Sequence, residues 1–254
     1  MRIVIVGGTG LIGSRLAARL QASGDEVVIA APSTGVDTTT GRGVAEALAG
    51  ADVLVDVSNS PSFDGDAVRE FFTASTRTLL DAARAAGIRH LVALSVVGTD
   101  RLAESPYFQG KIAQERLITD GEVPFTIVHA TQFYEFVRSI ADAATENGIV
   151  RLAPVGIQPM AADDVAAALA AIVHENPAGG VVEIAGPERW TLDELVRTGL
   201  RVRGDARPVE ADPESRYFGA LLATDTLLPG ADARAATGSF AQWLADQEAG
   251  VASA

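Results

Sequence analysis

The chain opens with a short β-branched run that breaks into glycines and continues as an amphipathic stretch. In IVIVGGTGLIG, Gly7, Gly10 and Gly13 lie between a strand candidate, Arg2–Val6, and a helix candidate, Leu11–Ser23. Glycines at such a junction allow a tight turn and close backbone approach, and the helix N-terminus offers free N–H groups to a pyrophosphate. Because the glycines stand between a strand and a helix, the motif predicts a dinucleotide site.

The same alternation of strand and helix continues through the first half of the chain. Further strands are expected at Glu26–Ala31, Val53–Val57, His90–Val96 and Phe125–Ala130. Helices are expected at Val44–Ala49, Asp66–Ala86, Tyr107–Asp120 and Phe133–Asn147. Strands that are apolar on both faces and separated by helices imply a parallel sheet covered on both sides. The expected fold is therefore α/β, with a Rossmann-type doubly wound parallel sheet.

After about residue 148 the rhythm changes. A strand, IVRLAP, precedes a helix capped by Asp163 or Asp164, and a second strand, GGVVEIAG, precedes a helix that Thr191 and Glu194 would cap as a capping box. We expect one NAD(P)-binding unit over residues 1–254, with a cofactor-binding core at about 1–150. A small C-terminal substrate lobe is expected mainly at about 186–254.

Composition excludes several classes of protein. The formal net charge of −13 and the lack of basic clusters argue against a nucleic-acid partner and against an anionic membrane surface. The chain has no cysteine, and its three histidines stand far apart, so a metal site is not expected. The opening run is too short for a signal peptide, and no apolar run reaches the length of a membrane span. A cytoplasmic protein is expected.

The single lysine stands out among the cations. Lysine and arginine total 20, and a count along the sequence gives 19 arginines and Lys111 alone. Ser105 and Pro106 are suited to begin a helix, which would place Tyr107 and Lys111 on one face, one turn apart. One lysine has to fall somewhere, so its position alone is weak evidence. The alternative is a site that needs a compact cation, rather than a planar guanidinium, beside a phenol.

The motifs together resemble a known family. The glycine spacing is GxxGxxG, and GGTGLIG occurs with LSVVGTD, YFQGKIAQE and ATQFYEF. This set resembles the NmrA-like, NAD(P)H-binding group of atypical short-chain dehydrogenases/reductases, over residues 1 to about 200. The resemblance implies a catalytic set of Ser95, Tyr107 and Lys111. In such a set serine holds the substrate oxygen, tyrosine donates a proton, and lysine lowers the tyrosine pKa and binds the nicotinamide ribose.

The resemblance also implies cofactor contacts along the chain. They are Gly7, Thr9, Gly10, Leu11, Ile12, Gly13, Ser33, Thr34, Ser58, Asn59, Ser95, Lys111, Ala130, Thr131, Gln132 and Phe133. The alternative for Asn59 and Gln132 is an ordinary polar strand end that enters solvent. Six aromatic residues could line a substrate pocket, or could belong to the core. They are Phe133, Tyr134, Phe136, Trp190, Tyr217 and Phe218.

NADP(H) is favoured over NAD(H). In NAD-binding folds an acidic residue at the end of the second strand holds the ribose hydroxyls, whereas this strand is followed by Pro32, Ser33 and Thr34, with no acid before Asp37. The loop also lacks an arginine for a 2′-phosphate, so Arg15 or Arg42 would have to reach it.

The function expected from these motifs is that of an NADP(H)-dependent oxidoreductase reducing a carbonyl, quinone or related conjugated small molecule. The alternative is a non-catalytic, NADP(H)-sensing regulatory protein that acts through a protein partner. A third interpretation, an epimerase or dehydratase with tightly held cofactor, is weaker. The sequence leaves open whether the chain is a monomer or a homodimer.

Overall fold

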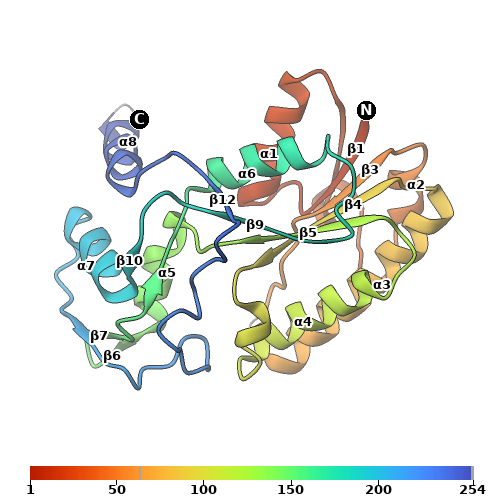
Figure 1. Ribbon diagram of the computed structural model, residues 1–254. Coiled ribbons are helices and arrows are strands. Elements are labelled where there is room, and N and C mark those ends of the chain that lie inside the picture. Colours follow the sequence, from red (N-terminus) through yellow and green to blue (C-terminus); the bar gives the residue numbers. More distant parts are fainter. Residues whose placement is uncertain (63, 253–254) are drawn as a thin grey trace. The chain divides into compact units, whose positions relative to one another are not determined.

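The computed structural model describes residues 1–62 and 64–252, and it contains a seven-stranded sheet (Figure 1). The strand order is β12-β9-β5-β4-β3-β1-β2, and β1 pairs in parallel with β2 and β3, as β3 does with β4. The strands are β1 Arg2–Val6, β2 Glu26–Ala30, β3 Val53–Asp56, β4 His90–Val96, β5 Phe125–Ala130, β9 Gly180–Ala185 and β12 Arg234–Ala235. The expected Rossmann-type α/β fold is confirmed.

Helices and two small sheets complete the described structure. The helices are α1 Leu11–Ala22, α2 Val44–Leu48, α3 Gly65–Ala86, α4 Pro106–Thr119, α5 Val137–Ala143, α6 Ala162–Ile172, α7 Leu192–Val202 and α8 Phe240–Ala252. One small sheet pairs β8 Gly156–Ile157 with β10 Trp190–Thr191. The other contains β6 Thr145–Glu146, β7 Ile149–Leu152 and β11 Val209–Ala211. No helix in the described ranges has the length and apolar character needed to span a bilayer.

The chain divides into two compact units. Unit 1 contains Met1–Ser95, Pro106–His129 and Val165–Val182. Unit 2 contains Val96–Ser105, Ala130–Asp164 and Glu183–Ala254. Unit 2 therefore takes in two segments from the region that the sequence assigns to the cofactor-binding core.

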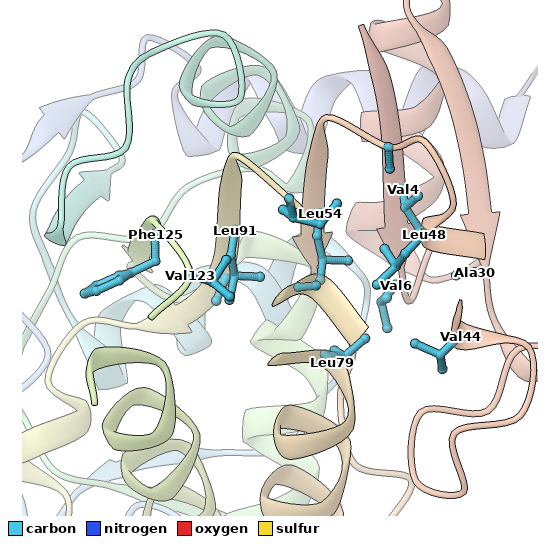
Figure 2. Packing of buried hydrophobic residues seen from close by; sticks show 14 of the residues in the cluster. Val4, Val6, Ala30, Val44, Leu48, Leu54, Leu79, Leu91, Val123 and Phe125 are labelled. Atoms are coloured by element: carbon cyan, nitrogen blue, oxygen red, sulfur yellow. The ribbon is translucent and has the colours of Figure 1, made fainter. Parts of the chain in front are cut away.

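The core of unit 1 lies between the sheet and its helices. Figure 2 shows Val4, Val6, Leu54 and Leu91 on neighbouring strands, packed with Leu79 of α3. Residues two apart on a strand point to the same face, so the apolar runs supply one continuous buried surface. Each of these side chains is at most 4% exposed. Truncating such a leucine to alanine typically costs about 2–5 kcal/mol of stability.

Several expectations about local structure are wrong. Asp163 and Asp164 lie inside the first turn of α6, so neither is its N-cap. The segment Phe133–Asn147 is not one helix but a 3-10 turn, Tyr134–Phe136, followed by α5 and the short strand β6. Asn147 and Gly148 both adopt positive φ and connect the antiparallel strands β6 and β7, so the backbone turns where the helix was expected to end. The capping box before α7 is not formed, because the Thr191 hydroxyl donates to Asp193 Oδ1, 2.7 Å away.

Candidate active site

The glycine loop leads from β1 into α1 within unit 1. Gly7 has φ +78°, and a Cβ there would lie 2.8 Å from the Ser58 backbone nitrogen. A Cβ at Gly13 would lie 2.2 Å from Gly7 O, whereas one at Gly10 would meet only that oxygen, at 3.2 Å. Glycine is therefore required by close packing at Gly7 and Gly13, whereas a Cβ at Gly10 would make one tight contact.

The start of α1 suits an anionic group. Gly10 is the N-cap, no side chain caps the helix, and its first turn contains no acidic residue. The first N–H groups of a helix have no intrahelical acceptors and carry the positive end of the dipole. A cofactor pyrophosphate fits this cradle, because no capping side chain among the described residues competes with it for those N–H groups.

The loop after β2 contains the other predicted phosphate contacts. Ser33 and Thr34 are both exposed, but the Thr34 hydroxyl is engaged locally, since it accepts from Ala31 N and lies within hydrogen-bond distance of Ile29 O. The first acid after the strand, Asp37, accepts hydrogen bonds from the Thr39 amide and hydroxyl. These bonds lower the Asp37 pKa, so its carboxylate is committed to its own turn.

The end of β3 lies directly against the glycine loop. Ser58 donates through its amide and hydroxyl to Asp56 Oδ1, and its backbone is the atom group closest to the Cβ position of Gly7. Asn59 Oδ1 accepts from the Tyr107 hydroxyl at 3.2 Å. The structure thus brings together four predicted site residues from three parts of the sequence.

Lys111 is buried rather than solvated, with 3% of its surface exposed. Its Nζ donates to Leu94 O at 2.8 Å and to Gln114 Oε1, and it lies 4.6 Å from the centroid of the Phe72 ring. Burial lowers the pKa of Lys111 to about 8, although the charges of Asp56 and Glu115 partly oppose the change. The cation is thus held inside unit 1 with its charge poised near neutral pH.

Tyr107 lies one turn before Lys111 on α4 but has different neighbours. Its ring makes edge contacts with Phe72 and Phe108, and its hydroxyl points to Asn59. Burial raises the pKa of Tyr107 to about 12. The phenol therefore keeps its proton at neutral pH. The lowered tyrosine pKa that the resemblance implies is not found, because burial alone sets the direction of the change and Lys111 donates to Leu94 O and Gln114 instead.

Ser95 belongs to a cluster that the sequence motifs do not mark. Its hydroxyl donates to Glu115 Oε1, and the same oxygen lies 3.0 Å from His129 Nε2. Burial raises the pKa of Glu115, but hydrogen bonds from His129 and Ser95 and the nearby Lys111 charge outweigh it, so the pKa lies below its usual value. Glu115 is therefore ionised beside the predicted catalytic serine.

Residues 130–133 lie in unit 2, where Thr131 N donates to Ile184 O and Met160 N donates to Gln132 O. The backbone of Thr131 and Gln132 is thus hydrogen-bonded, but within the described part of the chain their side chains are not. The Thr131 hydroxyl and both amide atoms of Gln132 are buried without a hydrogen-bond partner among the described residues. Buried polar groups without partners are costly, so this site fits a ligand that supplies donors and acceptors.

The aromatic residues proposed for a pocket divide between core and surface. Tyr134 is fully buried and packs against Phe240 and Trp243 of α8. Phe136 is 44% exposed and stacks on Phe133. Ser105, expected to cap α4, instead has a buried hydroxyl without a hydrogen-bond partner among the described residues.

The sequence motifs do not mark four polar residues of this site, namely Asp56, Gln114, Glu115 and His129, although helical and strand spacing indicates them. Gln114 and Glu115 follow Lys111 by three and four residues and so share its face of α4. Asp56 and His129 alternate with the buried apolar residues of β3 and β5, in the same way as Ser95 does on β4. The ends of parallel strands gather at one sheet edge, which brings all these side chains together.

Comparison with known proteins identifies the family of this chain. The model of a family described as NAD(P)H-binding matches residues 7–176. A reductase of Streptomyces griseus, named (4-alkanoyl-5-oxo-2,5-dihydrofuran-3-yl)methyl phosphate reductase, is 30% identical over 80% of this chain and 74% of its own length. Quinone oxidoreductase 2 of Escherichia coli is 28% identical over 57% of this chain and 51% of its own.

Two further comparisons are more distant. The photosystem II assembly factor Ycf39 of Trieres chinensis is 20% identical over 84% of this chain and 72% of its own length. The crystal structure of Escherichia coli NADPH-dependent quinone oxidoreductase QOR2 with NADPH has a TM-score of 0.63 and 24% identity, covering 83% of this chain and 77% of that chain. The family match and the fold together show that this chain belongs to the NAD(P)H-binding family, as the resemblance of its motifs to NmrA-like proteins predicted.

Proposed function

We propose that this chain is an NADP(H)-dependent reductase of a quinone, a carbonyl or a related conjugated small molecule. The observation that carries the proposal is the environment of Lys111. The sole lysine is buried on the helix that follows the end of β4, with its pKa lowered to about 8. A cation buried at a cost in desolvation, near other perturbed groups, is typical of a catalytic site.

The residues of unit 1 would divide the chemistry among them. When bound, the reduced nicotinamide supplies a hydride to an electrophilic carbon, and the substrate oxygen must then gain a proton. Tyr107 is protonated at neutral pH, because burial raises its pKa to about 12, and it would transfer that proton as negative charge develops on the oxygen. The protonated Lys111 would stabilise negative charge that develops nearby. Ser95 would orient the oxygen by turning its single O–H from Glu115 to the substrate. The start of α1 would hold the pyrophosphate.

The preference for NADP(H) rests on the loop after β2. An acidic side chain there would repel a 2′-phosphate, but Asp37 is turned into its own loop by Thr39. Ser33 is exposed on the 3-10 turn Pro32–Thr34 and could donate to such a phosphate. These features favour NADP(H), and the names of the reductase and quinone oxidoreductase relatives favour reduction as the activity.

The test combines cofactor binding with turnover. Calorimetric titration should give a Kd for NADPH about tenfold or more below that for NADH, equivalent to about 1.4 kcal/mol. Loss of NADPH absorbance should then depend on added quinone or enone. Equal affinity for the two cofactors would contradict the NADP(H) preference, and the absence of oxidation across a panel of quinones, enones and aldehydes would contradict the reductase.

The second candidate is a non-catalytic NADP(H) sensor that acts through a protein partner. The similarity to a protein named as an assembly factor favours it. A sensor needs the glycine loop but not a proton donor or a poised cation. Tight NADPH binding without turnover, unchanged by substitution of Lys111 or Tyr107, would favour the sensor over the reductase.

A further inference from the structure

Three buried side chains of unit 1 form a continuous chain of hydrogen bonds. Lys111 Nζ donates to Gln114 Oε1, and Gln114 Nε2 donates to Asp56 Oδ2 at 2.9 Å. The exposed fractions of Lys111, Gln114 and Asp56 are 3%, 2% and 3%. Polar groups buried this deeply are stable only when their hydrogen bonds are made, so the chain is a constrained unit.

The amide of Gln114 has only one orientation that satisfies both neighbours. Its carbonyl oxygen can accept from an ammonium group, and its NH₂ can donate to a carboxylate, whereas the flipped amide would face each neighbour with the wrong partner. Asp56 Oδ1 is occupied by the Ser58 amide and hydroxyl. The carboxylate is therefore fixed on one side by the end of β3 and on the other by Gln114.

We propose that Gln114 is a positioning residue, which links the carboxylate of Asp56 to Lys111 and thereby fixes both the place and the protonation of the ammonium group. The catalytic part of this inference rests on the proposed function. The electrostatic part does not, because it concerns only the side chains of unit 1. Leu94 O supplies the second acceptor and holds Nζ at β4.

The groups around Lys111 determine whether a substitution nearby raises or lowers its pKa. The face of Phe72 approaches from α3, the Leu94 carbonyl from β4, Asp56 from β3 through Gln114, and Glu115 from α4. His129 of β5 reaches the cluster through Glu115, and Tyr107 precedes it on the same helix. Burial lowers the Lys111 pKa and the carboxylates oppose this, so loss of the link to Asp56 should lower it further.

The unique lysine makes the protonation directly measurable. Protein grown with ¹³Cε-lysine has one labelled side chain, so its chemical shift against pH needs no assignment. The wild-type midpoint is expected at about 8. In Gln114→Met, which keeps the length but removes both hydrogen bonds, the midpoint should fall by about half a pH unit or more. Gln109→Met is the matched control, because Gln109 is exposed on the same helix, and it should titrate as wild type does.

Asp56→Asn provides a second variant if Gln114→Met does not fold, since it removes the charge and keeps the shape of the side chain. It should also lower the midpoint. A folded Gln114→Met or Asp56→Asn protein that titrates with the wild-type midpoint would overturn the inference. An unaltered midpoint accompanied by a lower Tm would show a merely structural glutamine.

NADPH oxidation separates this inference from the proposed function. If Lys111 acts when protonated, the wild-type kcat falls as pH rises through about 8. In Gln114→Met this fall in kcat should occur at a lower pH, in step with the lower NMR midpoint. A shifted NMR midpoint in a protein that turns over no substrate would support the link while contradicting the reductase. If Gln114→Met turns over substrate and both the pH of the fall in kcat and the NMR midpoint are those of the wild type, the positioning role of Gln114 is wrong while the reductase stands.

Discussion

Tyr107 and Lys111 share one face of α4, yet they make different contacts. The Tyr107 hydroxyl donates to Asn59, and the Lys111 ammonium turns inward to Leu94 and Gln114. From the sequence, Lys111→Arg is expected to lower kcat by about 10² or more, because a guanidinium is too wide for the site, and to leave the thermal stability almost unchanged. With Lys111 only 3% exposed, a wider guanidinium would overpack the site, so we expect that substitution to destabilise unit 1.

Substitution of Tyr107 tests the phenol as the proton donor. Tyr107→Phe removes one hydrogen bond to Asn59, which should cost about 1 kcal/mol of stability. If the phenol donates the proton, kcat should fall by about 10² to 10⁴. Tyr134→Phe is the control, since Tyr134 also loses one hydrogen bond, to Gly238 O, but lies in the core of unit 2. Denaturant unfolding and steady-state kinetics measure the two effects. Equal kcat values in both variants would rule out the phenol as the acid.

At the scale of elements, the sequence predicts the strands of unit 1 well and the site less completely. The strands β1, β4 and β5 have the predicted bounds, because a short apolar, β-branched run flanked by turn-forming or polar residues defines where a strand begins and ends. The single helix expected over Phe133–Asn147 does not form. Its apolar spacing is helical, but its course depends on tertiary pairing, including that of Phe133 with Met160. The roles of Gln114 and Glu115 depend on side chains from three other elements, which no local motif reveals.

In the glycine loop, substitutions of Gly10 and Gly13 should have different effects. Sequence alone treats Gly10 and Gly13 alike, but a Cβ at Gly13 would lie 2.2 Å from Gly7 O and one at Gly10 3.2 Å from it. Gly13→Ala should therefore cost roughly 1–3 kcal/mol of stability. Gly10→Ala, at φ −80°, should change stability by less than about 1 kcal/mol while weakening NADPH binding. Melting curves and calorimetric titration of both variants measure this. Wild-type NADPH affinity in Gly10→Ala would place the pyrophosphate elsewhere.

For the whole molecule, the buried lysine links stability to pH. The Lys111 pKa is lowered from 10.5 to about 8 in the folded protein, so between these values the unfolded chain binds one more proton than the folded one. Stability contributed by this group therefore rises with pH from about 8 to 10.5. The Tyr107 pKa is raised from 10.0 to about 12, so its contribution falls with pH above 10.

Comparison of the wild type with Lys111→Met isolates the lysine, because the other titrating groups are present in both proteins. The free energy of unfolding of the wild type minus that of the variant should rise by up to about 3 kcal/mol between pH 7.5 and 10.5. Urea unfolding at a series of pH values measures this difference. A difference that stays constant with pH would mean that the lysine titrates at its ordinary pKa.

The most direct test of the proposed active site is the rate of NADPH oxidation in single-turnover experiments at saturating NADPH and quinone. Lys111→Met should react about 10² or more times slower than the wild type at pH 7. Arg116→Met, which removes an exposed cation of the same helix, should react at the wild-type rate. If folded Lys111→Met that still binds NADPH reacts as fast as the wild type, the buried lysine has no part in catalysis and the proposed active site is wrong.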